Sequence, residues 1–123
     1  HPKEILQSAK SLKELYADKK VTAIFQPHLY TRTHDFYKEF AEALSHFDEV
    51  VLTEIYPARE EPIPGVTSSL IYDNLSPNIE KQMIQKNDVL NFVKSRDFDV
   101  LVVLGAGNLD NYVPEIAKIL NEK

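Results

Sequence analysis

Hydrophobic positions along the chain follow two different periods. Some short runs are almost continuously apolar and rich in β-branched residues, which is typical of strands buried on both faces of a parallel sheet. These runs are Lys20–Phe25, Glu49–Ile55 and Asp99–Leu104. Between them, apolar residues recur every three to four positions, as in amphipathic helices. This period predicts helices over Pro2–Tyr16, over His34–Phe47, and in a closing segment that carries Tyr112, Ile116, Ile119 and Leu120.

The remaining segments are shorter. Thr67 or Ser68 can cap a short helix that runs to about Leu75, and Asn87-Asp88 can open another. The stretch Asn78–Lys86 fits neither period. Helices that alternate with buried strands predict an α/β fold, with a Rossmann-like open, mostly parallel sheet and helices on both faces. We expect the ends of the three apolar runs to lie side by side, in a single domain over residues 1–123.

Composition narrows the class of protein. Hydrophobic residues make up 43% of the 123 residues and charged residues 27%, as in ordinary globular domains. With no cysteine, disulfides and thiolate metal sites are excluded. The net charge is -5 and no window clusters Lys and Arg, so we expect no nucleic-acid partner. No apolar run is long enough to span a membrane and no signal peptide is evident, so we expect no membrane partner. The absence of cysteine suits a reducing compartment, and we expect a cytoplasmic location.

In open α/β sheets, ligands bind beyond the carboxyl ends of the strands. Segments of unusual composition lie at those ends: Gln26–Thr33, Tyr56–Gly65 and Gly105–Asn108. In the first, Arg32 offers a planar fork for a carboxylate or phosphate, and the N–H groups at the start of the next helix favour the same anion. The alternative is that Thr31 or Thr33 caps the helix and Arg32 is a solvated charge.

The other two segments leave a structural and a functional reading open. Arg59 lies among prolines, either near a ligand or in a rigid surface turn. Gly105 and Gly107 are candidates for cofactor binding because glycine lets a ligand approach the backbone, although a tight strand-to-helix turn is the simpler explanation of both. The turn lacks the third glycine of a dinucleotide fingerprint and the lysine of a P-loop. No histidine pair has metal-ligand spacing, so we expect no metal site in this chain.

Four motifs, in order, resemble those of the UDP-N-acetylmuramate–L-alanine ligases of the Mur ligase family. Phe25–Thr33 resembles F-Q-P-H-x-Y-[ST]-R-T, and Ile55–Val66 is similar to Y-x-A-x-E-x-P-I-x-G-V. Leu104–Asn108 is similar to G-A-G-[DS]. The opening His1-Pro2 followed by Glu4-Ile5 resembles the end of D-Y-G-H-H-P-x-E-[IV]. Together the motifs span most of the chain.

The resemblance implies the C-terminal, Rossmann-like domain of a three-domain enzyme of peptidoglycan biosynthesis. That enzyme joins L-alanine to the lactyl carboxylate of UDP-N-acetylmuramate through an acyl-phosphate, using ATP and Mg²⁺. The chain has no P-loop, so we expect the other two domains to bind ATP, Mg²⁺ and UDP-N-acetylmuramate. We expect the isolated chain to bind no cofactor and to be inactive.

The resemblance also implies which residues contact the incoming amino acid: His1, His28, Arg32 and Tyr30. The chain departs from the pattern at Leu29, where many members have an arginine. Arg32 must then hold the substrate carboxylate alone, or Arg59 stands in for the missing arginine. His28 is a candidate proton acceptor for the amine, although orienting the substrate is the simpler role.

Two other functions compete with this interpretation. A related ligase that recycles murein peptides shares the domain type, but its loop lacks the Q-P-H-x-Y-T-R-T run. A stand-alone α/β ligand-binding module of the receiver type would have an acidic pair after its first strand. This chain has Gln26 and Glu54 at strand ends instead.

Overall fold

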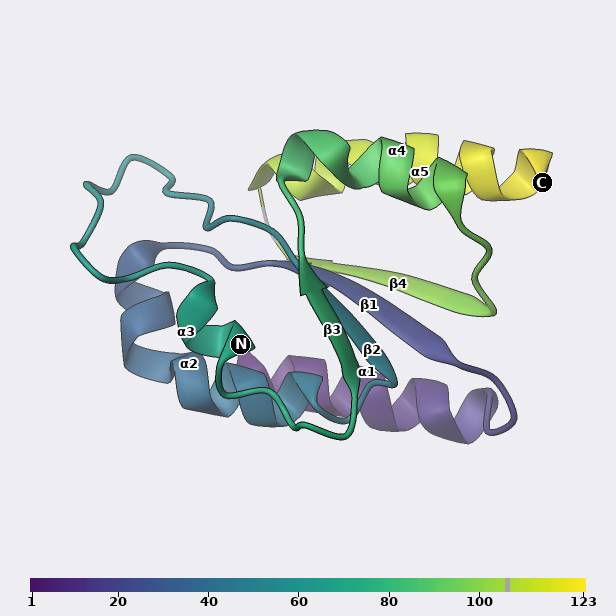
Figure 1. The fold of residues 1–123 in the computed structure, drawn as a ribbon, viewed down its shortest axis with the longest axis horizontal. Coiled ribbons are helices and arrows are strands. Elements are labelled where there is room, and N and C mark those ends of the chain that lie inside the picture. The colour runs from purple at the N-terminus through teal and green to yellow at the C-terminus, as the bar shows by residue number, and fades with distance from the viewer. Residues whose placement is uncertain (106) are drawn as a thin grey trace.

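The computed structural model describes residues 1–105 and 107–123, and it has the predicted α/β fold. Within these residues a parallel sheet has the strand order β3-β2-β1-β4 (Figure 1). The strands are β1 (Val21–Gln26), β2 (Glu49–Leu52), β3 (Glu80–Met83) and β4 (Val100–Gly105). The runs Lys20–Phe25, Glu49–Ile55 and Asp99–Leu104 form β1, β2 and β4 respectively, and β2 ends at Leu52 rather than Ile55. These three strands lie side by side, as expected.

Helices cover both faces of the sheet (Figure 1). On one face lie α1 (Pro2–Leu15), α2 (Tyr30–Leu44) and the short α3 (Ser69–Tyr72). On the other lie α4 (Val89–Ser95) and α5 (Val113–Glu122), preceded by the 3₁₀ turns η1 (Lys86–Asp88) and η2 (Gly107–Tyr112).

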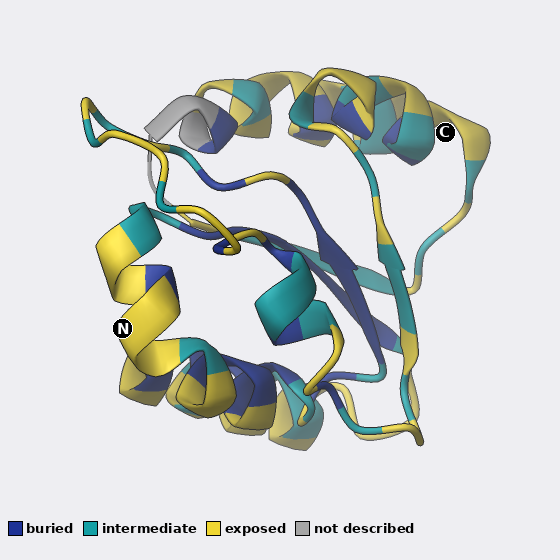
Figure 2. Ribbon diagram, turned by 60° about the vertical axis from the view of Figure 1, so that its left-hand side comes forward, coloured by how far each residue is buried: buried dark blue, intermediate teal, exposed yellow. Residues whose placement is uncertain are grey.

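The alternation of side chains along β1 produces two separate cores. Ala23 and Phe25 point toward α1 and α2, whereas Ile24 packs against α4 and α5. Figure 2 shows the buried central strands enclosed between helices whose outer surfaces are exposed. Because both faces of β1 are covered, its sequence is a continuous apolar run rather than an alternating one.

The predicted boundaries of α2 were wrong at both ends. The helix begins at Tyr30 rather than His34 and ends at Leu44 rather than Phe47. Its N-cap is Leu29, whose positive φ of 72° turns the chain sharply out of the preceding loop. Neither Thr31 nor Thr33 is the cap, so half of the predicted loop is the first turn of a helix.

The amino ends of β1 and β2 are joined by a buried carboxylate. Glu49, whose side chain is only 5% exposed, accepts hydrogen bonds of 2.8 and 3.0 Å from the Arg96 guanidinium and one of 3.0 Å from the Thr22 hydroxyl. Burial raises the pKa of Glu49, but the hydrogen bonds from Arg96 and Thr22 and the charges of Arg96 and Lys20 outweigh it, so the pKa is lowered. Glu49 is therefore held as a carboxylate.

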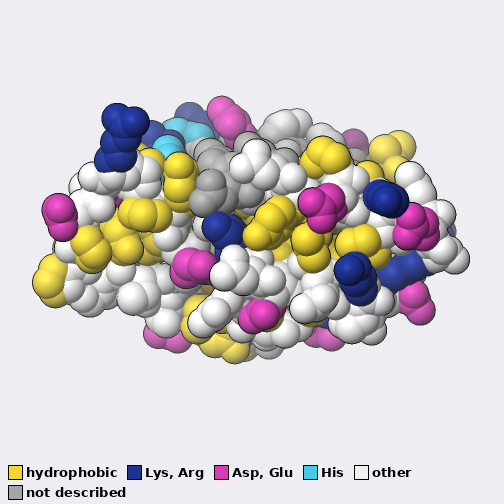
Figure 3. All heavy atoms as spheres, turned by 90° about the horizontal axis from the view of Figure 1, so that it is seen from above, with side chains coloured by type: hydrophobic (Ala, Val, Ile, Leu, Met, Phe, Trp, Pro, Cys, Tyr) yellow, Lys and Arg dark blue, Asp and Glu magenta, His cyan; other side chains and the backbone are white. Residues whose placement is uncertain are grey.

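The outer surface of the α4 and α5 layer mixes charges of both signs. Figure 3 looks onto this face, where lysine and arginine side chains are interspersed with acidic and hydrophobic ones. None of the described helices combines the length and the apolar character that a membrane span requires.

Candidate functional site

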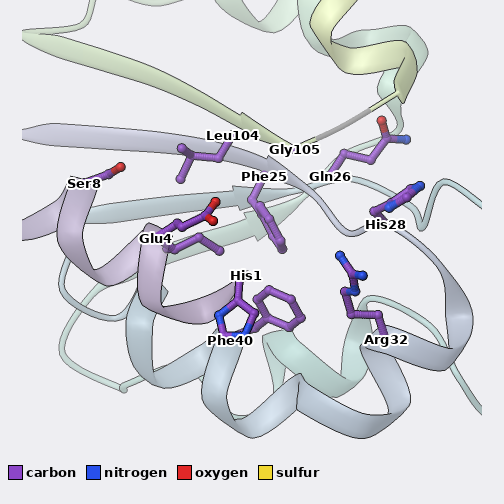
Figure 4. A pocket seen from close by; sticks show the side chains of 11 residues that line it. His1, Glu4, Ser8, Phe25, Gln26, His28, Arg32, Phe40, Leu104 and Gly105 are labelled. Atoms are coloured by element: carbon purple, nitrogen blue, oxygen red, sulfur yellow. The ribbon is translucent and has the colours of Figure 1, made fainter.

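A cavity of about 300 Å³ opens where the carboxyl ends of β1 and β4 meet the first turns of α1 and α2. Each of these elements contributes to its lining. Figure 4 shows its side chains: His1, Glu4, Ile5, Ser8, Phe25, Gln26, His28, Arg32, Phe40, Leu104 and Gly105. The cavity lies at the sheet edge where open α/β domains bind ligands.

The cavity has opposite charges on opposite sides. Arg32 of α2 and His28 approach from one side, and Glu4 and Ser8 of α1 lie across from them (Figure 4). The buried ring of Phe25 lies between the two sides. Arg32 forms no ion pair with any described residue, so its guanidinium remains available to an anion. A cation on one side and a carboxylate on the other suit a small zwitterion.

The first turn of α1 carries both His1 and Glu4 to the cavity. His1 is the N-cap, and its Nδ1 accepts a hydrogen bond of 3.3 Å from the Lys3 N–H. Its ring lies 6.3 Å from that of Phe36 on α2. Residues three apart share a helix face, so the position of His1 also brings Glu4 to the cavity. Sequence reasoning missed Glu4, although this spacing could have indicated it.

The loops that follow β1 and β2 continue to pair beyond the sheet. The Leu29 N–H donates to the Tyr56 carbonyl at 2.8 Å, and the Tyr56 N–H donates to the Pro27 carbonyl at 2.8 Å. The rings of His28 and Tyr56 stack with centroids 5.7 Å apart. Pairing of the two loops therefore holds His28 at the edge of the cavity.

The sequence suggested that the N–H groups at the start of α2 face an open anion site, but the structure shows that they do not. Glu60 occupies them: its Oε1 accepts from the N–H groups of Tyr30 at 2.6 Å and Thr31 at 3.1 Å. The Thr31 hydroxyl donates to Glu60 Oε2 at 2.5 Å. The hydrogen bond from this hydroxyl, together with those from the backbone and the charge of His28, lowers the pKa of Glu60. The prediction was wrong because a carboxylate thirty residues away fills the position.

The sequence left open whether Gly105 is needed for ligand binding or for close packing of the backbone, and the structure shows that packing requires it. A Cβ at Gly105 would lie 2.8 Å from the carbonyl oxygen of Gln26, so this position needs glycine whether or not a ligand binds. Gln26 is buried, its Nε2 donates to the Glu54 carbonyl at 3.3 Å, and its Oε1 has no partner among the described residues. Gly107 begins η2, while Ala106 lies outside the described residues.

The structure brings some of the candidate residues together and leaves others apart. His1, His28, Arg32 and Gly105 line the cavity. Tyr30 and Arg59 are not among its lining residues, and Arg59 is exposed with a positive φ of 78°. No group of three or more described histidine, aspartate or glutamate residues is arranged to hold a metal ion.

Comparison with known proteins gives close relatives. No model of a known protein family matches the chain. The UDP-N-acetylmuramate–L-alanine ligase of Phocaeicola vulgatus is 62% identical over all 123 residues, which cover 27% of that protein. The ligases of the same name from Parabacteroides distasonis and Flavobacterium johnsoniae are 51% and 47% identical over 98% and 99% of the chain. The chain spans about a quarter of the length of these curated relatives.

Two solved structures are similar to the chain over almost its whole length. The UDP-N-acetylmuramate-alanine ligase of Thermotoga maritima superposes with a TM-score of 0.74 at 25% identity, over 99% of this chain and 25% of that one. A domain of a UDP-N-acetylmuramate:L-alanyl-γ-D-glutamyl-diaminopimelate ligase from Haemophilus ducreyi has a TM-score of 0.60 at 18% identity, a likeness of fold alone. It covers 99% of this chain and 83% of that domain. The chain belongs to the UDP-N-acetylmuramate–L-alanine ligase family, in which it corresponds to the C-terminal domain.

Proposed function

We propose that the chain is the C-terminal domain of a three-domain, ATP-dependent UDP-N-acetylmuramate–L-alanine ligase of cytoplasmic peptidoglycan biosynthesis, and that its cavity binds L-alanine. The observation that carries this proposal is the position of Arg32, His28 and Glu4 around one cavity at the carboxyl edge of the sheet. Alanine is a small zwitterion, and its two charged groups match the charges on the two sides of the cavity.

Arg32 binds the carboxylate of the incoming alanine. A guanidinium can donate two parallel hydrogen bonds to a carboxylate, which fixes the orientation of the substrate as well as its position. Glu60 already neutralises the start of α2, and Arg59 is not a lining residue, so Arg32 carries this interaction alone. Leu29 is the N-cap of α2 and does not line the cavity.

The amine of alanine faces the other polar side chains. It must lose a proton before its lone pair can form the new C–N bond, and His28 or Glu4 can accept that proton or orient the amine by hydrogen bonding. Holding the amine at a fixed angle to the activated carboxyl group supplies much of the rate increase, because a bimolecular step becomes effectively intramolecular. His1 completes the polar rim from the start of α1.

The other parts of the enzyme supply ATP and Mg²⁺. When bound, ATP provides the phosphoryl group that activates the lactyl carboxylate. The described residues of this chain offer no cluster of metal ligands, and the sequence has no P-loop. This domain therefore contributes the amino-acid half of the active site, and it completes that site by approaching the other domains.

The direct test is ATP-dependent ligation by the full-length protein that contains this chain. We expect turnover with UDP-N-acetylmuramate that requires L-alanine and is slower with glycine, serine and larger amino acids. Turnover with a murein tripeptide, and none with alanine, would instead assign the protein to the recycling ligases. Absence of both activities, with a bound small ligand, would favour a binding module.

A further inference from the structure

The start of α2 is capped by a residue that is distant in sequence. Leu29, the N-cap, makes no side-chain capping hydrogen bond. The free N–H groups of Tyr30 and Thr31 donate to Glu60, and the Thr31 hydroxyl donates to the same carboxylate. These three hydrogen bonds connect the segment after β1 to the proline-rich segment after β2.

The proline-rich segment is shaped so that Glu60 can reach the helix. Ala58 and Arg59 both have positive φ, 47° and 78°, which reverses the chain between Tyr56 and Glu60. The Glu60 N–H closes this turn by donating to the Pro57 carbonyl at 2.9 Å. Non-glycine residues with positive φ cost free energy, so the surrounding contacts must hold them in place.

Tyr56 and Glu60 both form hydrogen bonds with the segment that carries the cavity residues His28 and Arg32. Tyr56 pairs with the backbone on both sides of His28 and stacks on its ring. Glu60 binds the backbone immediately before Arg32. His28 and Arg32 are therefore fixed by the same neighbouring loop, one at each end of a five-residue stretch.

We propose that Glu60 is a positioning residue of the alanine site, which holds His28 and Arg32 toward the cavity by clamping the first turn of α2. It does not touch the substrate, and it is not a lining residue of the cavity. Its carboxylate also fills the positive end of α2, which leaves the substrate carboxylate to Arg32. This inference rests on the proposed function and adds a residue to it.

The test compares three variants of the full-length enzyme. Glu60→Ala removes the three hydrogen bonds from Tyr30 and Thr31, which we call the clamp. Glu60→Gln retains one acceptor oxygen but loses the charge. Glu61→Ala is the matched control. Glu61 is exposed and makes no hydrogen bond with a described residue. Hydrogen exchange measured by mass spectrometry on peptides that cover residues 28–34 reports the clamp without any need for activity.

We expect Glu60→Ala to speed exchange of the Tyr30 and Thr31 amides by about 2- to 30-fold, the range for loss of a helix cap. The KM for alanine should rise about tenfold while the KM for UDP-N-acetylmuramate stays within twofold. Glu60→Gln should fall between the wild type and Glu60→Ala, and Glu61→Ala should match the wild type. Thr31→Val should weaken alanine binding in the same direction, and Thr31→Ser should restore it.

Two results would overturn the inference. One is unchanged exchange in Glu60→Ala, which would mean that Glu60 does not clamp the helix. The other is faster exchange with an unchanged KM for alanine, which would make Glu60 a helix cap with no role in the site. A wild-type enzyme without alanine-dependent turnover would contradict the proposed function instead, and the exchange data would still decide whether the clamp exists.

Discussion

Gly105 at the end of β4 lies against the backbone of Gln26 at the end of β1. A Cβ at Gly105 would be 2.8 Å from the Gln26 carbonyl oxygen and 3.2 Å from its nitrogen, and Gly105 has a φ of 133°. Both residues line the cavity, so this close approach shapes part of its wall. The glycine is required by the packing of two strands, independently of any ligand.

Gly105→Ala should therefore destabilise the domain by at least about 2 kcal/mol, because it adds a backbone clash to an unfavourable φ. Gly65→Ala is the matched control: Gly65 also has a positive φ, 81°, but no atom lies within 4 Å of its Cβ position. The control should cost only about 1 kcal/mol. Urea unfolding of both variants measures the difference, and equal losses would show that the contact with Gln26 does not matter.

The ion pair between Arg96 and Glu49 should support the fold without affecting the site. Removing one partner of a buried pair costs about 3–5 kcal/mol, and Arg96 is 31% exposed, so we expect Arg96→Met to lose about 2–4 kcal/mol. Methionine keeps part of the packing of the Arg96 side chain between the Phe92 and Phe98 rings. The double variant with Glu49→Gln should regain part of the loss.

Arg96 and Glu49 lie at the amino edge of the sheet, opposite the cavity. Their variants should leave the KM for alanine in the full-length enzyme within twofold of the wild type. A large rise in that KM would show that the two edges of the sheet are coupled, which nothing in the described contacts indicates.

Stability should fall as the pH falls below about 4.5. Burial raises the pKa of Asp48, but the hydrogen bonds from Lys13 and the Val21 N–H outweigh it, so that pKa lies below the ordinary 3.8. The pKa of Glu49 likewise lies below the ordinary 4.5, because the hydrogen bonds from Arg96 and Thr22 outweigh burial. The unfolded chain then binds more protons over this range, so the stabilisation is complete above about pH 4.5 and is lost as the pH falls through the lowered pKa values.

Unfolding free energies at about pH 7, 4.5 and 3 measure this dependence. Glu49→Gln should lower the free energy of unfolding at neutral pH and should reduce its further fall at acid pH, which is the acid limb of the curve. The control, Glu61→Gln, should leave the curve unchanged. An acid limb that is equally steep in Glu49→Gln would assign the loss of stability to other carboxylates.

The isolated chain should fold but should have no ligase or ATPase activity. It contains both hydrophobic cores of the sheet, but its sequence lacks a phosphate-binding loop. Circular dichroism, cooperative urea unfolding and an ATP turnover assay on the purified chain check both statements. ATP hydrolysis that a point change in this chain abolishes would contradict the second.

The strands that the sequence predicted best, β1, β2 and β4, are those with almost continuously apolar runs. Of these, β1 and β2 are buried on both faces, whereas β4 lies at the edge of the sheet and is only partly buried, contrary to the prediction. Ile24 and Val51 are fully buried, and their neighbours are apolar, so no other element fits those runs. β3 was not predicted because it is half exposed: Glu80, Lys81 and Gln82 give neither period, and it forms because β2 offers an unpaired parallel edge. Tertiary pairing, rather than local pattern, makes this strand.

The site was predictable only in part, for a similar reason. The carboxyl edge of the sheet correctly indicated that the segments after β1 and β2 would converge, and that Gly105 at the end of β4 would lie beside the first of them. The resemblance selected His28 and Arg32. Glu60 could not be found as the cap of α2, because its partners are some thirty residues away and local threonines fit the capping pattern better. Glu4 was missed because a charged residue in a first helical turn needs no functional explanation.

The most direct measurement is the steady-state KM for alanine in the full-length enzyme with Arg32→Ala, with Arg59→Ala as the control for loss of one positive charge. Loss of a charge-assisted hydrogen bond of about 1.5–3 kcal/mol predicts a rise of about 10- to 150-fold in that KM. The KM for UDP-N-acetylmuramate should be nearly unchanged. Arg32→Lys should recover only part of the loss, because lysine keeps the charge without the bidentate fork. Wild-type alanine kinetics in Arg32→Ala, or an equal rise in Arg59→Ala, would contradict the assignment of this cavity as the alanine site.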